Sequence, residues 1–225
     1  MTAIQQSCKQ NRTIQTLRSL AGTAMIIGVL TSHTGCNKPN TESGLSNDGS
    51  IAAKATNTIR LLDDYSDPVC NTSGAARLLI DDKTTGSQSR ADQKIDNGVL
   101  SVSGELIPGR GVPAFISLVS PLADDGTPEN LSGYQGVRIV VKVTQGMLCV
   151  QVASSVIENY DYHTSAPISG AEQEFKEILL PFTDLKRAWS GQTRLDLKSI
   201  TSVNLVSFSV AREAFAYQVD EISFY

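Results

Sequence analysis

Four consecutive residues in the second half of the chain combine side chains suited to chemistry: Tyr160, Asp161, Tyr162 and His163. They include two of the six tyrosines and the one histidine outside the first 35 residues. Aromatic faces stack on the apolar C–H side of a sugar, while a carboxylate and an imidazole hydrogen-bond its hydroxyls. The cluster therefore predicts a surface for a polar, ring-shaped ligand. The alternative is structural, with tyrosines packed at a sheet edge and His163 bonded to backbone.

The cluster lacks the partners that a catalytic centre needs. The sequence contains no Gly-x-Ser-x-Gly elbow and no P-loop, and nothing marks a serine as a triad partner for His163. One histidine cannot build a histidine-rich zinc or iron site within a chain. Paired carboxylates recur, but glycoside hydrolysis needs two carboxyl groups at a set distance across a cleft. We therefore expect a protein that is not an enzyme.

Alternating apolar and polar residues predict the strands that position this cluster. From Val137 to Val143 the odd positions are Val, Ile, Val and Val, with Arg138 and Lys142 between them. A period of two is typical of a half-buried strand. Similar runs occur around 99–103, 148–153, 206–210 and 217–225, and helical periodicity is scarce. This pattern indicates an all-β fold, an antiparallel β-sandwich of the jelly-roll type.

Turn-forming residues separate the runs. Asp96-Asn97-Gly98 is one such turn, and Gln145-Gly146 joins two strong strand runs, so we expect a tight hairpin at Gln145-Gly146. The segment from Phe182 to Trp189 follows Pro181 and predicts one short helical turn.

The N-terminus reads as an export signal. Its charges are all basic, and an apolar run from Leu20 to Leu30 leads to Thr34-Gly35-Cys36. This resembles a bacterial lipoprotein signal in which Cys36 is lipidated, although His33 stands where leucine is usual. Ordinary cleavage nearby and an uncleaved anchor are the alternatives. We expect a signal peptide over residues 1–35, a flexible tether over 36–58 and a β-sandwich domain over 59–225, anchored to a bacterial membrane.

Cysteine content and charge agree with export. Without residues 1–35 the chain keeps 16 Lys and Arg against 23 Asp and Glu. Such an acidic chain lacks the basic field that nucleic-acid binding requires. Cys70 and Cys149 form an even pair, which predicts a disulfide between them in an oxidising compartment. Two buried thiols are the alternative.

Several segments, taken in order, resemble the galactose-binding-like jelly-roll group over most of residues 60–225. The similarity is to the domain of complex I intermediate-associated protein 30 and to family-eleven carbohydrate-binding modules. The sequence departs from relatives in lacking a tryptophan before the 81–89 loop, and Trp189 is its only tryptophan. The segments that carry the resemblance are Leu61–Tyr65, Asp81–Ser89, Leu131–Val137, Tyr160–His163, Ile178–Phe182 and Val219–Phe224.

Together with the N-terminal signal, this resemblance implies a non-catalytic, membrane-anchored module that binds a glycan. The other implied function is an assembly or chaperone-like factor that binds an envelope protein. A glycan site would be formed by Tyr160, Asp161, Tyr162 and His163, extended by Trp189 or, for uronic acids, by Arg138. Trp189 capping the sandwich and Arg138 on a solvated exterior are the structural alternatives.

The resemblance also implies a structural calcium ion between the first and last strands. Carboxylates at Asp63, Asp64, Asp220 and Glu221 would supply oxygen ligands of the kind that calcium prefers. The alternative is a solvated acidic edge, which discourages pairing between sheets of different molecules.

Overall fold

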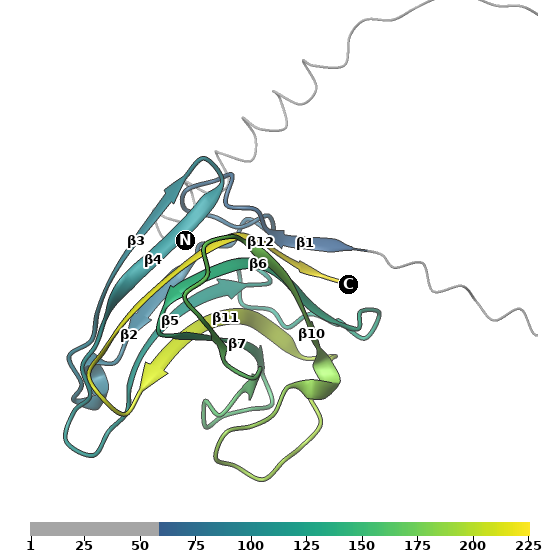
Figure 1. Cartoon of the computed structure of the whole chain (residues 1–225). Coiled ribbons are helices and arrows are strands. Elements are labelled where there is room, and N and C mark those ends of the chain that lie inside the picture. The colour runs from purple at the N-terminus through teal and green to yellow at the C-terminus, as the bar shows by residue number, and fades with distance from the viewer. Residues whose placement is uncertain (1–58) are drawn as a thin grey trace, which may run out of the picture.

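Two antiparallel sheets pack face to face in the computed structural model, which describes residues 59–225 (Figure 1). The predicted all-β sandwich is confirmed. The predicted signal peptide of residues 1–35, the lipidation residue Cys36 and the tether of residues 36–58 lie outside the described residues. Within residues 59–225, no helix is long and apolar enough to cross a membrane.

The first sheet has the strand order β10, β6, β12, β4, β3, and β1 pairs with β12 beside this path. The pairing of β1 with β12 places the two ends of residues 59–225 side by side, as the resemblance implies. The strands are β1 (Arg60–Asp63), β3 (Arg90–Asp96), β4 (Val99–Leu106), β6 (Gly136–Gln145), β10 (Lys176–Pro181) and β12 (Glu213–Phe224).

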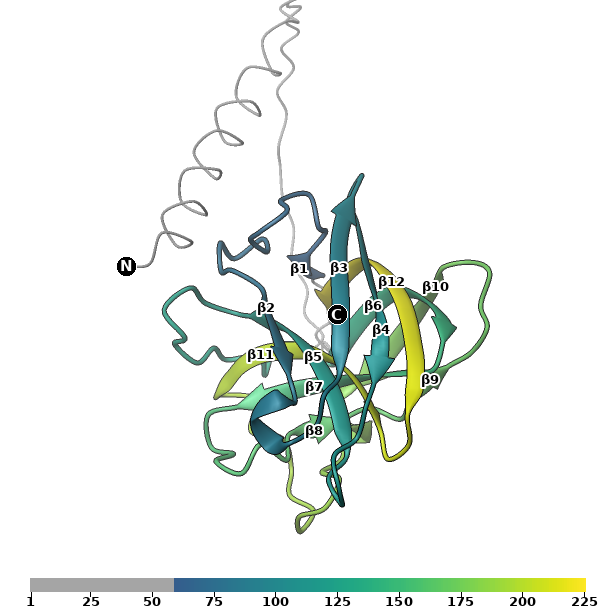
Figure 2. The ribbon, with the colours of Figure 1, turned by 90° about the vertical axis from the view of Figure 1, so that its left-hand side faces the viewer.

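The second sheet has the order β2, β5, β11, β7, β8, and β9 also pairs with β7. Figure 2 looks at the sandwich from the edge where β2 of this sheet and β3 of the first sheet lie. Its strands are β2 (Leu78–Asp81), β5 (Ala114–Pro121), β7 (Met147–Ser154), β8 (His163–Thr164), β9 (Ile168–Ser169) and β11 (Ile200–Ser209). Two short 3-10 helices complete the fold, η1 (Lys83–Thr85) and η2 (Phe182–Asp184), and η2 confirms the predicted helical turn.

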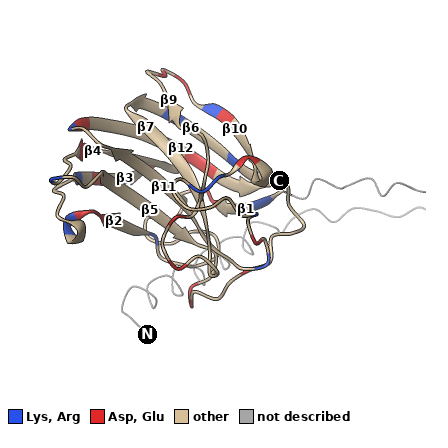
Figure 3. Ribbon diagram, turned by 90° about the horizontal axis from the view of Figure 1, so that it is seen from below, with Lys and Arg blue, Asp and Glu red and all other residues tan. Residues whose placement is uncertain are grey.

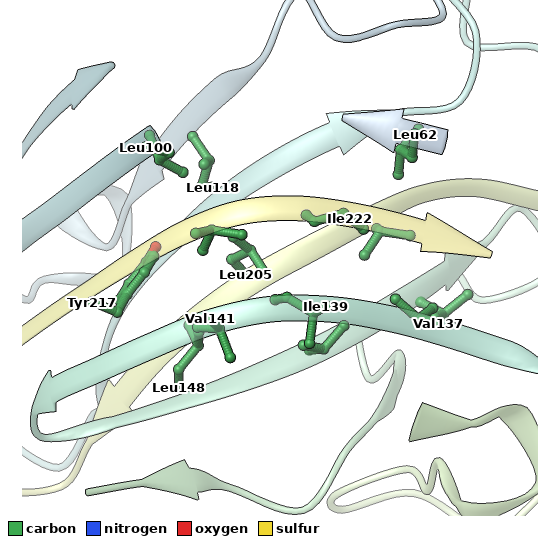
Figure 4. Close-up of a cluster of buried hydrophobic side chains, with 14 of the residues drawn as sticks. Leu62, Leu100, Leu118, Val137, Ile139, Val141, Leu148, Leu205, Tyr217 and Ile222 are labelled. Carbon is green, nitrogen blue, oxygen red and sulfur yellow. The ribbon is translucent and has the colours of Figure 1, made fainter. Parts of the chain in front are cut away.

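Alternation along the strands builds the core. Val137, Ile139 and Val141 of β6 are buried against apolar side chains from the facing sheet, such as Leu148 and Leu205 (Figure 4). Burying each such side chain contributes roughly 1.5–3 kcal/mol, so the register of a strand with one buried face, such as β6, is strongly fixed.

The two predicted turns have different structures. Asn97 and Gly98 both have positive φ, 51° and 76°, and connect β3 to β4 as a two-residue hairpin. The predicted hairpin at Gln145-Gly146 is wrong, because β6 belongs to the first sheet and β7 to the second. Gly146, at φ 70°, turns the chain between the sheets where a Cβ atom would lie 3.0 Å from the Ala214 carbonyl oxygen. Alternation marks both strands but does not assign them to a sheet.

The predicted Cys70–Cys149 disulfide is also wrong, because Cys149 is a free, buried thiol. Cys149 lies opposite Val206 of β11, in mid-sheet. Cys70 lies beyond the end of β5, where its neighbour Asn71 bonds the Pro121 carbonyl oxygen. Bridged cysteines need Cα atoms within about 7 Å, whereas Cys149 lies within β7 and Cys70 lies outside the named strands, in an isolated bridge with Ala76.

Candidate functional site

The outer face of the second sheet carries no charged side chain on its three central strands. Neither β5, β7 nor β11 contains an Asp, Glu, Lys or Arg, and the three strands are uncoloured in the charge view (Figure 3). Registers across the sheet place one set of uncharged side chains on this face. They are Phe115, Ser117, Val119 and Pro121 of β5, Ser202, Asn204, Val206 and Phe208 of β11, and Cys149, Gln151 and Ala153 of β7.

This uncharged face lies on the inner side of a curve, because both sheets bow in the same direction (Figure 1). Its centre is shielded, with Asn204 and Val206 buried. At the β2 edge, Leu78 and Ile80 point outward and are 50% and 45% exposed. Phe208 at the end of β11 is 39% exposed. The floor of this curved face is thus neutral, and its exposed side chains stand at the flanks.

At the opposite flank, two loops beside β8 present aromatic rings. We call residues 155–162 the Tyr160 loop and residues 186–193 the Trp189 loop. Tyr160 is 75% exposed and Trp189 is 70% exposed, whereas Tyr162 is half-buried. The rings of Tyr160 and Tyr162 meet edge to face, with centroids 6.3 Å apart. A tryptophan that is 70% exposed contributes little to capping the sandwich. The exposure of Trp189 therefore favours the prediction that it extends the glycan site.

Asp161 points away from solvent, contrary to a ligand-contacting role. Its carboxylate is 1% exposed and accepts three backbone N–H groups: Ala188 at 2.8 Å on Oδ1, and Trp189 at 3.1 Å and Ser190 at 2.6 Å on Oδ2. Burial alone would raise the pKa of Asp161, but its hydrogen bonds with Ser190, Ala188 and Trp189 outweigh burial and lower that pKa. Asp161 is therefore an ionised anchor for the Trp189 loop.

His163 is also buried, so its side chain is not positioned to contact a ligand directly. It lies opposite Val152 on β7 and faces the core with it. Its Nε2 atom lies 2.8 Å from the carbonyl oxygen of Thr193, at the end of the Trp189 loop. Its Nδ1 atom is buried without a hydrogen-bond partner among the described residues. The structural alternative, an imidazole bonded to backbone, describes His163 correctly.

Arg138 lies on the outer face of the first sheet, away from the aromatic cluster. It pairs with Glu177 of β10 at 2.6 Å and with Glu221 of β12, and its side chain is mostly buried by these partners. Hydrogen bonding to Glu177 raises the pKa of Arg138. The structure therefore separates Arg138 from the tyrosines, and a uronic-acid site built from both does not form.

The four carboxylates expected to bind calcium do not gather. Asp63 is buried and accepts two hydrogen bonds from Arg77, at 2.6 and 2.5 Å. Burial raises the pKa of Asp63, and Arg77 opposes that rise. Asp64 instead bonds the backbone and hydroxyl of Ser66. Among the described residues, no group of three or more His, Cys, Asp or Glu side chains could hold a metal ion.

Calcium binding at Asp63, Asp64, Asp220 and Glu221 receives no support from this arrangement and stays a prediction. Measuring the melting temperature of the protein with EDTA and with added calcium tests this prediction. A value unchanged by EDTA and by added calcium would contradict it.

Two amides that sequence reasoning missed lie on the uncharged face. Asn204 and Gln151 stand opposite each other on β11 and β7, and their side chains project outward. The sequence pattern that could have indicated this face is the absence of charged residues from 114–121, 147–154 and 200–209. The strands of the first sheet, by contrast, contain charged residues.

Comparisons with solved structures support the fold. The family 11 carbohydrate-binding module of the cellulosomal cellulase Lic26A-Cel5E of Clostridium thermocellum superposes with a TM-score of 0.56 at 16% identity. The match covers 74% of this chain and 94% of the module. The same values hold for the family 11 module from Clostridium thermocellum in complex with a β-1,3-1,4-mixed-linked tetrasaccharide.

No protein-family model matches the sequence, and no curated protein matches it. The resemblance to complex I intermediate-associated protein 30 therefore stays a prediction. What the structural matches show is that residues 59–225 share the jelly-roll sandwich architecture of carbohydrate-binding modules.

Proposed function

We propose that residues 59–225 form a non-catalytic carbohydrate-binding module. The observation that carries this proposal is that two exposed rings, Tyr160 and Trp189, are held on loops next to β8, the edge strand of the sheet whose outer face is uncharged and curved inward (Figure 1). Aromatic rings held at the edge of a flat surface stack on sugar rings, and each stacked ring removes apolar area from water. The likeness in fold to family 11 modules, one of them bound to a tetrasaccharide, supports the same proposal.

The absence of charge from β5, β7 and β11 favours a neutral glycan on this sheet face. Arg138 and Lys142 project from the first sheet, where Arg138 is already paired, so neither supplies a contact for uronic acids on this face. The Tyr160–His163 cluster also offers no free acid pair, since the Asp161 carboxylate is occupied by three backbone donors. Glycoside hydrolysis requires two available carboxyl groups, so a binding role suits this cluster better than hydrolysis.

A screen of immobilised polysaccharides with residues 59–225 tests the proposal. We expect retention on at least one neutral glycan, lost on Tyr160→Ala. Phe175→Ala is the matched control, because Phe175 is an exposed ring that lies beside Lys142 of the first sheet. Equal retention of both variants would refute the assignment of the site. No retention on any glycan would refute the function.

A protein partner is the second candidate, and the aliphatic flank at β2 favours it. Leu78 and Ile80 stand exposed on an edge strand, where a protein surface would find apolar contacts and unpaired strand backbone. Cross-linking in envelope extracts would separate the two functions. A specific protein adduct lost on Ile80→Lys, together with no glycan binding, would reverse their order.

We also propose export and lipid anchoring through Cys36, with the tether holding the module near a bacterial membrane. The sequence of residues 1–58 is the support for this. Membrane fractionation of the full chain and of Cys36→Ala tests it. We expect the wild type in the membrane fraction and the variant released, and equal partition would contradict lipidation.

A further inference from the structure

We infer that Asp161 is a positioning residue for the glycan surface: its buried carboxylate holds the Trp189 loop against the Tyr160 loop and sets where the two exposed rings stand. This inference rests on the proposed function, since the placement of the rings matters to affinity only if a ligand stacks on them.

Three neighbouring backbone amides share the Asp161 carboxylate as their acceptor. The N–H groups of Ala188, Trp189 and Ser190 all point to it, at 2.6 to 3.1 Å. Charge-assisted hydrogen bonds of this kind are stronger than neutral ones, and they are stronger still out of water. The tip of the Trp189 loop is therefore tied to the residue that follows Tyr160.

Separate contacts hold the two ends of the Trp189 loop. Lys186 and Thr164 exchange two backbone hydrogen bonds, at 2.9 and 3.0 Å, which ties the start of the loop to β8. The carbonyl oxygen of Thr193, at the other end, lies 2.8 Å from His163 Nε2. Because the ends are fixed elsewhere, the Asp161 carboxylate acts on the tip, where Trp189 stands.

Arg187 and Asn159 tie the Tyr160 loop to the same centre. The Arg187 guanidinium donates to the Asp161 carbonyl oxygen at 3.1 Å and to Asn159 Oδ1 at 3.0 Å, and lies 3.8 Å from the Asp161 carboxylate. Asn159 also donates to the Ser190 hydroxyl at 2.9 Å. Each loop thus supplies both donors and acceptors to the other.

Tyr160 adopts a conformation that an isolated chain would rarely populate. Its φ is 61°, in the left-handed region that L-residues other than glycine seldom occupy. The Asp161 amide, which follows it, donates to Asn159 Oδ1 at 3.3 Å, closing a turn across Tyr160. Contacts on both sides of Tyr160 therefore over-determine a strained geometry that leaves its ring in solvent.

Loops fixed before binding do not have to be ordered by the ligand. Ordering a loop and its side chains on binding opposes association, so rigid sites bind more tightly than mobile ones with the same contacts. Removing the Asp161 carboxylate should free the tip of the Trp189 loop while its ends stay fixed. We expect glycan affinity to fall about tenfold from this loss of preorganisation.

Trp189, the only tryptophan, reports on the loop without any ligand. We expect Asp161→Asn and Asp161→Ala to lower the fluorescence anisotropy of Trp189 and to weaken glycan binding about tenfold. Far-UV circular dichroism should stay that of the sandwich. Asp196→Asn is the matched control, since Asp196 bonds only its own turn, at Lys198 and Ser199. If the Asp161 variants do not fold, Arg187→Gln tests the same contact more gently.

Unchanged anisotropy in Asp161→Ala would overturn the inference, whatever the glycan result. Lowered anisotropy with undiminished affinity, for a glycan whose binding Trp189→Ala weakens, would overturn it too. If the wild type binds no glycan, the proposed function fails and the inferred effect on affinity fails with it. The anisotropy then decides only whether Asp161 orders the loop.

Discussion

Trp189→Ala should weaken glycan binding strongly while leaving the stability of the domain almost unchanged. A tryptophan side chain offers roughly 200 Å² of surface. Because Trp189 is 70% exposed, the accessible share is about 140 Å², and a sugar stacked on one face covers about half of it. At about 25 cal/mol per Å², this lost contact amounts to ~1.8 kcal/mol, or about a twentyfold rise in Kd. The same exposure predicts a change of less than about 0.5 kcal/mol in the free energy of unfolding.

Isothermal titration with a retained glycan measures the first quantity, and urea unfolding followed by circular dichroism measures the second. Phe175→Ala again serves as the control, with Kd unchanged. The reasoning is refuted if Kd stays the same for Trp189→Ala. It is also refuted if unfolding free energy falls by about 2 kcal/mol or more, because Trp189 would then be a packing residue.

Three further predictions concern the scaffold and its pH response. Asp63→Asn should cost about 3–5 kcal/mol of unfolding free energy in urea, because it leaves the buried Arg77 guanidinium uncompensated; a loss below about 1 kcal/mol would contradict this. The Asp161 carboxylate has a lowered pKa, so its stabilisation is present above the ordinary carboxyl pKa of about 4 and is lost as pH falls through the folded value. Melting temperatures of wild type and Asp161→Asn should therefore differ at neutral pH and converge in acid, and a constant difference would be inconsistent with an ionised anchor. Gly104→Ala should prevent normal folding, since its Cβ would lie 2.0 Å from a backbone carbonyl oxygen of β3, whereas Gly133→Ala, in open space, should be neutral in thermal melts.

Strand positions were predictable because alternation is a local property. The run from Val137 to Val143 shows in the sequence which residues are buried, and the structure buries those residues. Assignment of strands to sheets is not local. Gln145-Gly146 looks like a hairpin turn because strong strands flank it, yet the strands separate into different layers. Only the packing of the whole core decides whether a glycine turn joins two neighbouring strands of one sheet or connects a strand of one sheet to a strand of the other.

Within the predicted Tyr160–His163 site, the structure gives Asp161 and His163 roles other than contact with a ligand. Alternation does not extend into a loop, so nothing local indicated that Asp161 points inward to amides of residues 188–190. Those donors lie 27 to 29 positions away in the chain, and the pairing appears only when both loops close over β8. The sequence left Arg138 open between a glycan contact and the sandwich exterior for a related reason, because a strand pattern gives its two faces without saying which one curves inward.

The two outer faces of the sandwich differ in charge. The first sheet exposes charges along β3, where Arg90, Asp92, Lys94 and Asp96 alternate with less polar positions, and such an edge resists pairing with other chains. The second sheet leaves β5, β7 and β11 without charge and places its exposed apolar groups at both flanks. Core packing demands only that inner positions be apolar, so it does not explain the neutrality of the outer ones. The centre of that face is itself buried, with Asn204 4% and Val206 6% exposed, so an unpaired charge there would lose its hydration at a cost. Burial therefore accounts for the absence of charge at the centre of this face, and the exposed side chains at its flanks, such as Leu78, Ile80 and Phe208, are the ones whose neutrality burial does not explain.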